Sequence, residues 1–391
     1  MNEAYKIMHK KAQRKMCIIT ECIKNYLQKM KRVIISGYKI CKRLPNEVDK
    51  YMNIKDIAKL AGVSTATVSR VINNSGYVKE ETKKRITDII KENDYVPNAI
   101  ARSLCMQNTI NIGVIVPDIS NEFFAEVIRG ITETVEENAL NVLLFNTDEQ
   151  ESREHSYLKI AESERLKGII IAPVSAKDKV SRKELLRLEK AGVPIVLLDR
   201  DMEGVELDGV FADNFHGAYD GVKALIQEGH EKIAIITGPV TSLPGRERLR
   251  GYKEALKSFE IPIREEYIVS GDFKIDKAYV STKELLSLDE KPTAIFTVNN
   301  LTSLGCLKYI TEQGLIPGKD IAVLGYDSIT TLNAIAYPFS AVERDARRQG
   351  REAVRLLLQK LTAGNENGMK QVRKVVIPYK IQLRGSEKYV K

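Results

Sequence analysis

Apolar positions along the chain change their spacing near residue 111. Between Ile54 and Asn93 they recur at helical intervals of three or four residues, in three short groups. These groups are Ile54, Ile57, Ala58 and Ala61, then Val68, Val71 and Ile72, and then Ile86, Ile89 and Ile90. Pro97 ends the third helical pattern, because proline disfavours helical geometry in the residue before it. The spacing predicts a small domain of three helices over residues 52–97.

Beyond residue 111, short continuous apolar runs alternate with longer amphipathic stretches. Continuous apolar strands separated by helices are typical of a parallel sheet covered on both faces. The runs are Ile112–Val116, Val142–Phe145, Ile169–Ala172, Ile195–Leu198, Ile233–Ile236, Ala294–Val298 and Ile321–Leu324. This pattern is too long for one ordinary sheet, so it predicts two doubly wound lobes. We expect an N-lobe of residues 111–212 and 344–376, and a C-lobe of residues 213–343 and 377–385.

The formal net charge of +9 is concentrated at the start of the 391-residue chain. Residues 1–51 hold 13 Lys and Arg against 4 Asp and Glu, and the remainder is neutral. Bulk charge is therefore poor evidence for nucleic-acid binding. Three explanations of this basic extension stay open: a start codon assigned too far upstream, a disordered tail that adds nonspecific DNA affinity, or an additional functional domain.

Composition and motifs exclude several classes of protein. The five cysteines have no metal-ligand spacing, and their odd number without a secretion signal fits a reducing cytoplasm. No stretch reaches the ~18 consecutive apolar residues of a membrane span. The sequence lacks the glycine-rich dinucleotide fingerprint, the phosphate loop and the zinc-protease motif, and its four histidines are scattered. We expect a soluble cytoplasmic protein without metal, cofactor or enzymatic activity.

The segment from Ile54 to Asn73 has the pattern of a helix-turn-helix. Gly62 allows the sharp turn because it tolerates positive φ, and Ser64 is placed to cap the second helix. Packing Val68, Val71 and Ile72 inward leaves a small polar outer face, as a helix in the DNA major groove requires. A packing unit whose exposed side chains carry no function is the alternative.

Side-chain chemistry assigns roles to that outer face. Arg70 is suited to guanine, Thr65 to a base edge or phosphate, and the Ala66 methyl to thymine. The predicted DNA-binding set also includes Ser64 and Ser69, with Thr67, Asn73 and Tyr77 better placed for phosphates.

The order of these residues resembles the lactose-repressor (LacI/GalR) family of bacterial regulators. The resemblance is carried by Ile54-Lys55-Asp56-Ile57-Ala58, Gly62-Val63-Ser64, Thr67–Asn73, Val78–Thr82 and Tyr95–Leu104, and it covers residues 52–385. It implies a hinge helix within residues 98–110 that enters the minor groove, with contacts from Asn98, Ala101 and Arg102 and with Leu104 wedged between base pairs. Such a wedge unstacks and bends the duplex. Cys105 stands where a basic residue is common, which weakens the expected contact there.

Polar and aromatic residues follow several predicted strands. In doubly wound folds, ligands bind where the carboxyl ends of the strands converge. The clusters are Pro117–Phe124, Asp199-Arg200, Ala212–Asn214, Gly245–Arg248, Gly271–Phe273 and Asn299-Asn300. Aromatic rings cover the C–H surface of a sugar, while charged and amide groups bind its hydroxyls. Taken singly, each cluster has a structural explanation, such as a surface salt bridge or a core pair; together they predict a small polar ligand.

The resemblance extends to the family's effector domain and to periplasmic sugar-binding proteins, especially those for ribose. It implies effector contacts from Asn121, Phe123, Asp199, Arg200, Arg248, Phe273, Asn299, Asp327 and Arg344, with Asp213 beside them. Two positions depart from the family pattern: Asn300 replaces the usual Asp, and Arg344 replaces a common Gln. Both changes make the expected pocket more positive, so we expect a phosphorylated or carboxylated sugar.

The resemblance also implies how the protein works. An effector changes the angle between the lobes, and the hinge helices of a homodimer transmit this change to a palindromic operator. With only residues 386–391 after the effector domain, no leucine heptad tail for tetramers is expected. The sequence is thus interpreted as an allosteric repressor of carbohydrate-utilisation genes, and a chain starting at Met52 is expected to keep specific binding. Control by a partner protein is the alternative, whereas a bare sugar-binding protein would need an export signal.

Overall fold

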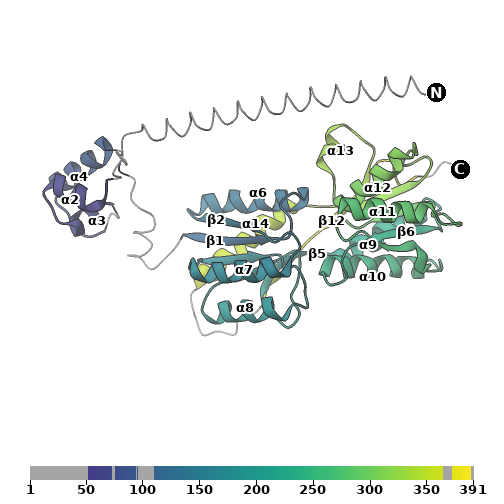
Figure 1. Ribbon diagram of the computed structural model, residues 1–391, viewed down its shortest axis with the longest axis horizontal. Helices are drawn as coiled ribbons and strands as arrows, with labels where there is room; N and C mark the ends of the chain where they lie inside the picture. Colours follow the sequence, from purple (N-terminus) through teal and green to yellow (C-terminus); the bar gives the residue numbers. More distant parts are fainter. Residues whose placement is uncertain (1–51, 73–74, 94, 96–109, 364–371, 389–391) are drawn as a thin grey trace, which may run out of the picture. The chain divides into compact units, whose positions relative to one another are not determined.

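The computed structural model describes residues 52–72, 75–93, 95, 110–363 and 372–388 (Figure 1). The chain divides into two compact units, residues 1–105 and residues 106–391. Several predicted features lie outside the described residues: the basic extension, Asn73, and the hinge residues Asn98, Ala101, Arg102 and Leu104 with Cys105.

Three short helices form the described part of the first unit: α2 (Ile54–Ala61), α3 (Thr65–Ile72) and α4 (Glu80–Glu92). Asn53 caps α2 by accepting hydrogen bonds from two backbone N–H groups, and the Asp56 carboxylate accepts from the Asn53 N–H in return. One residue from each helix is fully buried in a common core, namely Ile57, Val68 and Ile86. The three predicted helices are confirmed.

The second unit consists of two lobes, and the N-lobe is built on a parallel sheet with strand order β11-β5-β4-β3-β1-β2. Helices α6 and α14 pack on one face of this sheet, and α7 and α8 pack on the other. The strands are β1 (Asn111–Val116), β2 (Asn141–Asn146), β3 (Gly168–Ile171), β4 (Ile195–Leu198), β5 (Asp208–Ala212) and β11 (Lys374–Ile377). The helices are α6 (Glu122–Glu137), α7 (Glu151–Ser163), α8 (Lys179–Lys190) and α14 (Ala346–Ala363).

The C-lobe repeats this plan with strand order β12-β10-β9-β8-β6-β7. Helices α9 and α10 cover one face and α11 and α12 the other. The strands are β6 (Ile233–Thr237), β7 (Ile268–Ser270), β8 (Ala294–Thr297), β9 (Ala322–Tyr326), β10 (Ser340–Arg344) and β12 (Tyr379–Gln382). The helices are α9 (Asn214–Gln227), α10 (Leu243–Ser258), α11 (Ile275–Leu286), α12 (Asn300–Glu312), the short α13 (Thr330–Ala334) and the 3-10 helix η1 (Glu265–Tyr267).

One edge of the C-lobe sheet differs from the expected parallel arrangement, because β12 runs antiparallel to β10. The chain leaves the C-lobe at the end of β10 to form α14, and it returns from β11 directly into β12. The two strands therefore cross the junction between the lobes in opposite directions. The predicted pair of doubly wound lobes is confirmed, and the expectation of parallel strands is wrong at this edge.

The chain passes between the lobes after Ala212, after Arg344 and after Ile377 in the part that the structure describes. Parallel strands of both sheets end at this junction, so the loops after β1, β4, β8 and β9 face one another across it. None of the described helices combines the length and hydropathy that a bilayer crossing requires.

Candidate functional site

The turn between α2 and α3 depends on Gly62, which adopts a left-handed conformation with φ 63° and ψ 36°. Its N–H donates back to the carboxyl end of α2, which closes the helix. Ser64 then caps α3, because its Oγ accepts from the Thr67 N–H at 3.2 Å. Ser64 Oγ also lies 2.9 Å from Thr67 Oγ1. The predicted turn and cap are confirmed.

Helix α3 buries one side and presents the other to solvent. Val68 is fully buried, and Val71 and Ile72 pack against the same core. Thr65, Ala66 and Arg70 are exposed, whereas Thr67 and Ser69 are half-buried. Tyr77, after the helix, is 87% exposed. With no acidic residue in its first turn, α3 offers hydroxyl, methyl and guanidinium groups that suit the edges of bases and the phosphates beside them.

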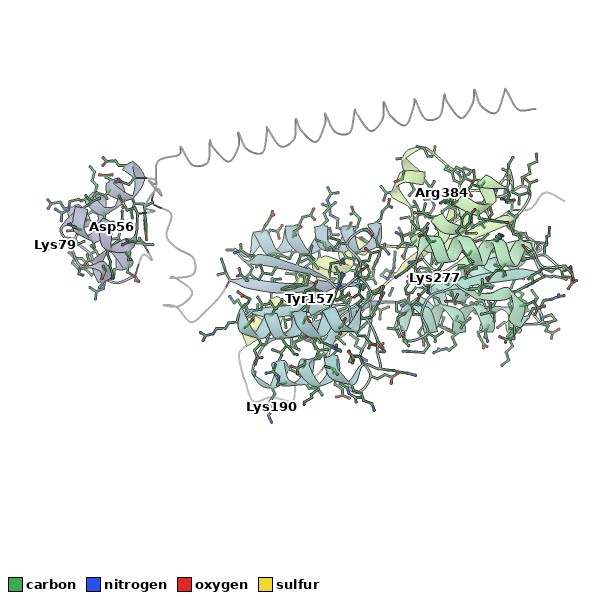
Figure 2. All side chains as sticks on the ribbon, viewed as in Figure 1. Asp56, Lys79, Tyr157, Lys190, Lys277 and Arg384 are labelled. Atoms are coloured by element: carbon green, nitrogen blue, oxygen red, sulfur yellow. The ribbon has the colours of Figure 1, made fainter. Side chains whose placement is uncertain are left out.

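A cavity of about 340 Å³ lies between the lobes at the carboxyl ends of the strands. Its wall includes nearly all the residues predicted for effector binding: Asn121, Phe123, Asp199, Arg200, Arg248, Phe273, Asn299, Asp327 and Arg344. Another wall residue, Lys277, belongs to the C-lobe (Figure 2). The structure thus assembles one polar cavity from segments that are far apart in sequence.

Arg344 bridges two buried carboxylates at the centre of this cavity. Its Nε donates to Asp327 Oδ1 at 2.7 Å, its Nη2 donates to Asp327 Oδ2 at 3.2 Å, and its Nη1 donates to Asp199. Burial alone would lower the pKa of the guanidinium, but the two carboxylates offset this and hold that pKa above its ordinary value. Burial likewise opposes ionisation of Asp199, yet Arg344 and Arg248 keep the pKa of that carboxyl below its ordinary value.

The other two cavity arginines have partners as well. Arg200 forms a bidentate pair with Glu149, with N···O distances of 2.8 and 2.6 Å. Arg248 donates from Nε to Asn214 Oδ1 at 2.9 Å and from Nη1 to the Val298 carbonyl. Burial and the nearby Arg344 lower the pKa of Arg248. Arg200 Nε and Arg248 Nη2 are buried without a hydrogen-bond partner, so each has a donor to offer a ligand.

Aromatic rings stack against the guanidinium groups of two cavity arginines. The Arg344 guanidinium lies 3.6 Å from the ring centroid of Phe123, and that of Arg248 lies 3.6 Å from the centroid of Tyr326. On the C-lobe wall, Phe273 packs against the bare backbone of Gly238, where a Cβ would come within 2.1 Å of the ring. A larger residue at 238 would therefore displace an aromatic wall of the cavity.

Two cavity asparagines are also helix N-caps. Asn121 Oδ1 accepts from the Phe123 N–H at 2.9 Å at the start of α6, and Asn299 Oδ1 accepts from the Thr302 N–H at 2.8 Å at the start of α12. Because the oxygens are used in capping, the amide N–H groups are what these side chains can offer a ligand.

The backbone is unusual at several wall residues. Asp199, Asp327 and Phe273 have positive φ values of 60°, 66° and 54°. Non-glycine residues in this region cost of order 1 kcal/mol or more, and they concentrate at binding sites. Backbone hydrogen bonds stabilise two of these turns, because the N–H groups of Asp199 and Asp327 donate at 2.8 Å to Val210 and Val342.

The expected excess of positive charge is not present in the cavity. Six carboxylates and five cationic side chains line it, and Arg344 is neutralised by Asp199 and Asp327. Asn300 is not part of the wall; it is buried and donates to Asn121 instead. Sequence reasoning counted the two departures as charge changes, but it did not predict the partners that compensate Arg344.

Asp213 is not among the cavity residues either. Its carboxylate caps α9 by accepting from the His216 N–H at 3.1 Å, and it also pairs with the His216 ring at 2.8 Å. The crossing after β5 therefore ends in a helix cap rather than in the cavity wall.

Other wall residues were missed. Asp148 and Glu149 follow β2, Lys274 directly precedes α11, and Lys277 lies in the first turn of that helix. Glu149 could have been predicted as a wall residue, because it lies in the loop after a predicted strand, as Asp199 does. In the described residues, no group of three or more His, Cys, Asp or Glu side chains is arranged to hold a metal ion.

Two family models match the chain. Residues 53–98 match the model described as bacterial regulatory proteins, lacI family. Residues 109–384 match the model described as periplasmic binding proteins and sugar binding domain of LacI family.

Individual relatives agree with these matches. The chain is 33% identical over 308 residues to the HTH-type transcriptional repressor PurR of Vibrio atlanticus (strain LGP32), covering 79% of the chain and 91% of that protein. The lac repressor dimer bound to operator and the anti-inducer ONPF superimposes with a TM-score of 0.73 at 25% identity, covering 87% of the chain and 100% of that structure. A LacI family regulator from Enterococcus faecium with bound ribose has a TM-score of 0.63 at 26% identity, covering 72% and 100%.

Proposed function

The chain belongs to the LacI family of bacterial regulatory proteins, and we propose that it is a transcriptional repressor whose operator affinity is controlled by a small neutral polyhydroxylated effector. One observation carries this proposal: a single chain combines an exposed helix suited to reading DNA with a buried polar cavity at a junction of two lobes. The partners we propose are operator DNA, the effector and a second copy of the chain.

DNA reading is assigned to α3. Arg70 is the strongest candidate for base contact, because a guanidinium can bind the O6 and N7 atoms of guanine together. Thr65, Ala66 and Ser69 complete the outward face of the helix. Ser64, Thr67 and Tyr77 are assigned to contacts with the phosphate backbone of the DNA. A palindromic operator follows if two copies bind as a symmetric dimer.

The effector is assigned to the cavity between the lobes. Paired carboxylates and guanidinium groups can both accept from and donate to hydroxyls, and the adjacent rings can cover a C–H face. A neutral ligand fits this balance, since a phosphate would face Asp199, Asp327 and Glu149 as well as the arginines. The ribose-bound relative supports a sugar, and we propose genes of carbohydrate utilisation as the targets.

The test of DNA reading begins by selecting binding sites from random DNA with the full chain. Arg70→Ala is expected to weaken binding to the selected site about 10- to 100-fold, because one bidentate base contact is lost. Binding to unrelated DNA should change much less. Fluorescence anisotropy measures both affinities.

The matched control is Arg85→Ala, which removes an exposed arginine from α4 of the same unit. It should leave the sequence preference intact. Equal preference and affinity in wild type and Arg70→Ala would contradict the assignment of α3 as the reading helix.

A further inference from the structure

The two lobes touch directly on two sides of the junction between them. On one side, the start of α6 contacts α12 and α13; on the other, the Ala176 N–H donates to the Thr241 carbonyl at 3.1 Å (Figure 1). Arg246 and Asp201 add an ion pair at 3.6 Å on that second side. On the α6 side, two consecutive residues, Asn121 and Glu122, both bind the opposite lobe.

Hydrogen-bond directions at the first contact are determined by neighbouring bonds. Asn121 Oδ1 already accepts from the Phe123 N–H, and Asn300 Oδ1 accepts from the Leu301 N–H at 2.9 Å. Asn300 therefore turns its Nδ2 to Asn121 Oδ1, at 2.9 Å. Asn121 is only 7% exposed and Asn300 only 1%. A carboxylate at position 300 would place an oxygen against an oxygen and could not form this bond.

Glu122 forms the second contact with both of its oxygens. It accepts from the Thr330 N–H at 2.8 Å and from Thr331 Oγ1 at 3.2 Å, at the start of α13. Hydrogen bonds to an ionised acceptor are stronger than neutral ones. Asn121 and Glu122 are consecutive, whereas their partners Asn300 and Thr330 are thirty positions apart. The start of α6 in the N-lobe therefore binds both α12 and α13 of the C-lobe.

We propose that Asn121 and Glu122, with Asn300, Thr330 and Thr331, form a cross-lobe lock that favours the closed cavity independently of the effector. Asn300 is then a positioning residue. Its Nδ2 is a second donor to Asn121 Oδ1, which already accepts from the Phe123 N–H, so the Asn121 amide N–H groups are what remains to meet an acceptor oxygen of the effector. The regulatory meaning of the lock rests on the proposed function, but the lock itself is a property of the two lobes.

The Thr330 amide provides a direct readout, because its cross-lobe bond exists only while the lobes are closed. Hydrogen–deuterium exchange of the full chain, resolved to single amides, measures its protection. Glu122→Ala should accelerate exchange at Thr330 about tenfold, the factor expected for loss of one hydrogen bond to a charged group. Asn300→Asp should also accelerate it, although residue 300 does not bind Thr330, because both contacts depend on the same closure.

Glu126→Ala is the matched control, since Glu126 lies one turn further along α6 and forms its ion pair within that helix, with Arg129. It should leave exchange at Thr330 unchanged. Exchange at the amides of β8 and β9, measured in the same experiment, reports whether the C-lobe stays folded. If Asn300→Asp unfolds the lobe, Asn300→Ser replaces it, because serine removes the amide donor without adding charge.

The proposed lock would be overturned if the Thr330 amide exchanged at the wild-type rate in Glu122→Ala. The same rate in both folded Asn300 variants would also overturn it. No DNA or effector enters this experiment, so its failure is distinct from a failure of operator binding.

Discussion

Three charged residues are buried together in this cavity, and each depends on the others for a partner. Arg344, Asp199 and Asp327 have side chains at most 7% exposed, and they satisfy one another across the lobe junction. A buried charge pair contributes little net stability when complete, but loss of one partner leaves an uncompensated charge. Arg344 is therefore as much a structural residue as a ligand-binding one.

Arg344→Ala tests this view. The variant should be destabilised by about 3–5 kcal/mol, because two buried carboxylates lose their shared cation. Urea unfolding of the full chain should show a lower midpoint for the transition of the lobes. Arg355→Ala, which removes an arginine that is 60% exposed and pairs with Glu352, should change the midpoint little.

The same variant should also change the dependence of stability on pH. Wild-type Asp199 has a lowered pKa, so its contribution to stability is present above its unfolded pKa of about 3.9 and is lost as pH falls through the folded value. Without Arg344 this contribution is reduced to what Arg248 and Arg200 supply. The difference between variant and wild type should thus be largest above pH ~4 and shrink as the pH falls below it; a difference that is constant with pH would contradict the pairing.

Elements were predicted well where local pattern decides them. Helical spacing from Ile54 to Ile90 and the apolar runs from Ile112 onward correspond to described helices and strands, because burial of one face or of both faces imposes those periods. The turn was predictable from Gly62 and Ser64 for the same reason. Each of these features depends on residues close together in sequence.

Features that depend on distant partners were not predictable. Arg344 meets Asp199 across 145 positions, and Asn300 meets Asn121 across 179, so their charges and hydrogen bonds could not be balanced from the sequence. Asp213 was assigned to the site from the resemblance and from its place after a strand, but the structure places it outside the cavity wall, where it caps α9. The reversed edge strand β12 depends on the route of the chain between lobes, which no local pattern records.

Gly62→Ala tests the turn between α2 and α3. No heavy atom would lie within 4 Å of the added Cβ, so the penalty should come from the backbone at φ 63° alone. About 1 kcal/mol of destabilisation is expected, with a smaller effect for Gly62→Asn, since asparagine tolerates this conformation better. Amide exchange of Val68 in the full chain should be about fivefold faster in Gly62→Ala; equal rates in wild type and variant would show that the turn does not limit stability.

The whole molecule places two functions on one chain. A ligand that binds both lobes can shift operator affinity only by the difference between its affinities for two lobe arrangements. The cross-lobe lock and the Arg344 bridge set the energy of the closed arrangement. Residues 98–110, predicted as the hinge, connect the lobes in sequence to the helix-turn-helix.

The most direct measurement is operator affinity of the full chain, by fluorescence anisotropy, with and without ribose, other neutral pentoses and hexoses, and ribose 5-phosphate. A neutral sugar is expected to shift the affinity about 5- to 150-fold, with a smaller shift from the phosphorylated one. Asp199→Asn should abolish the shift, while Asp213→Asn, outside the cavity wall, should keep it. A sugar that binds the protein in calorimetry but leaves operator affinity unchanged, or a preference for ribose 5-phosphate, would contradict control by a neutral effector in this cavity.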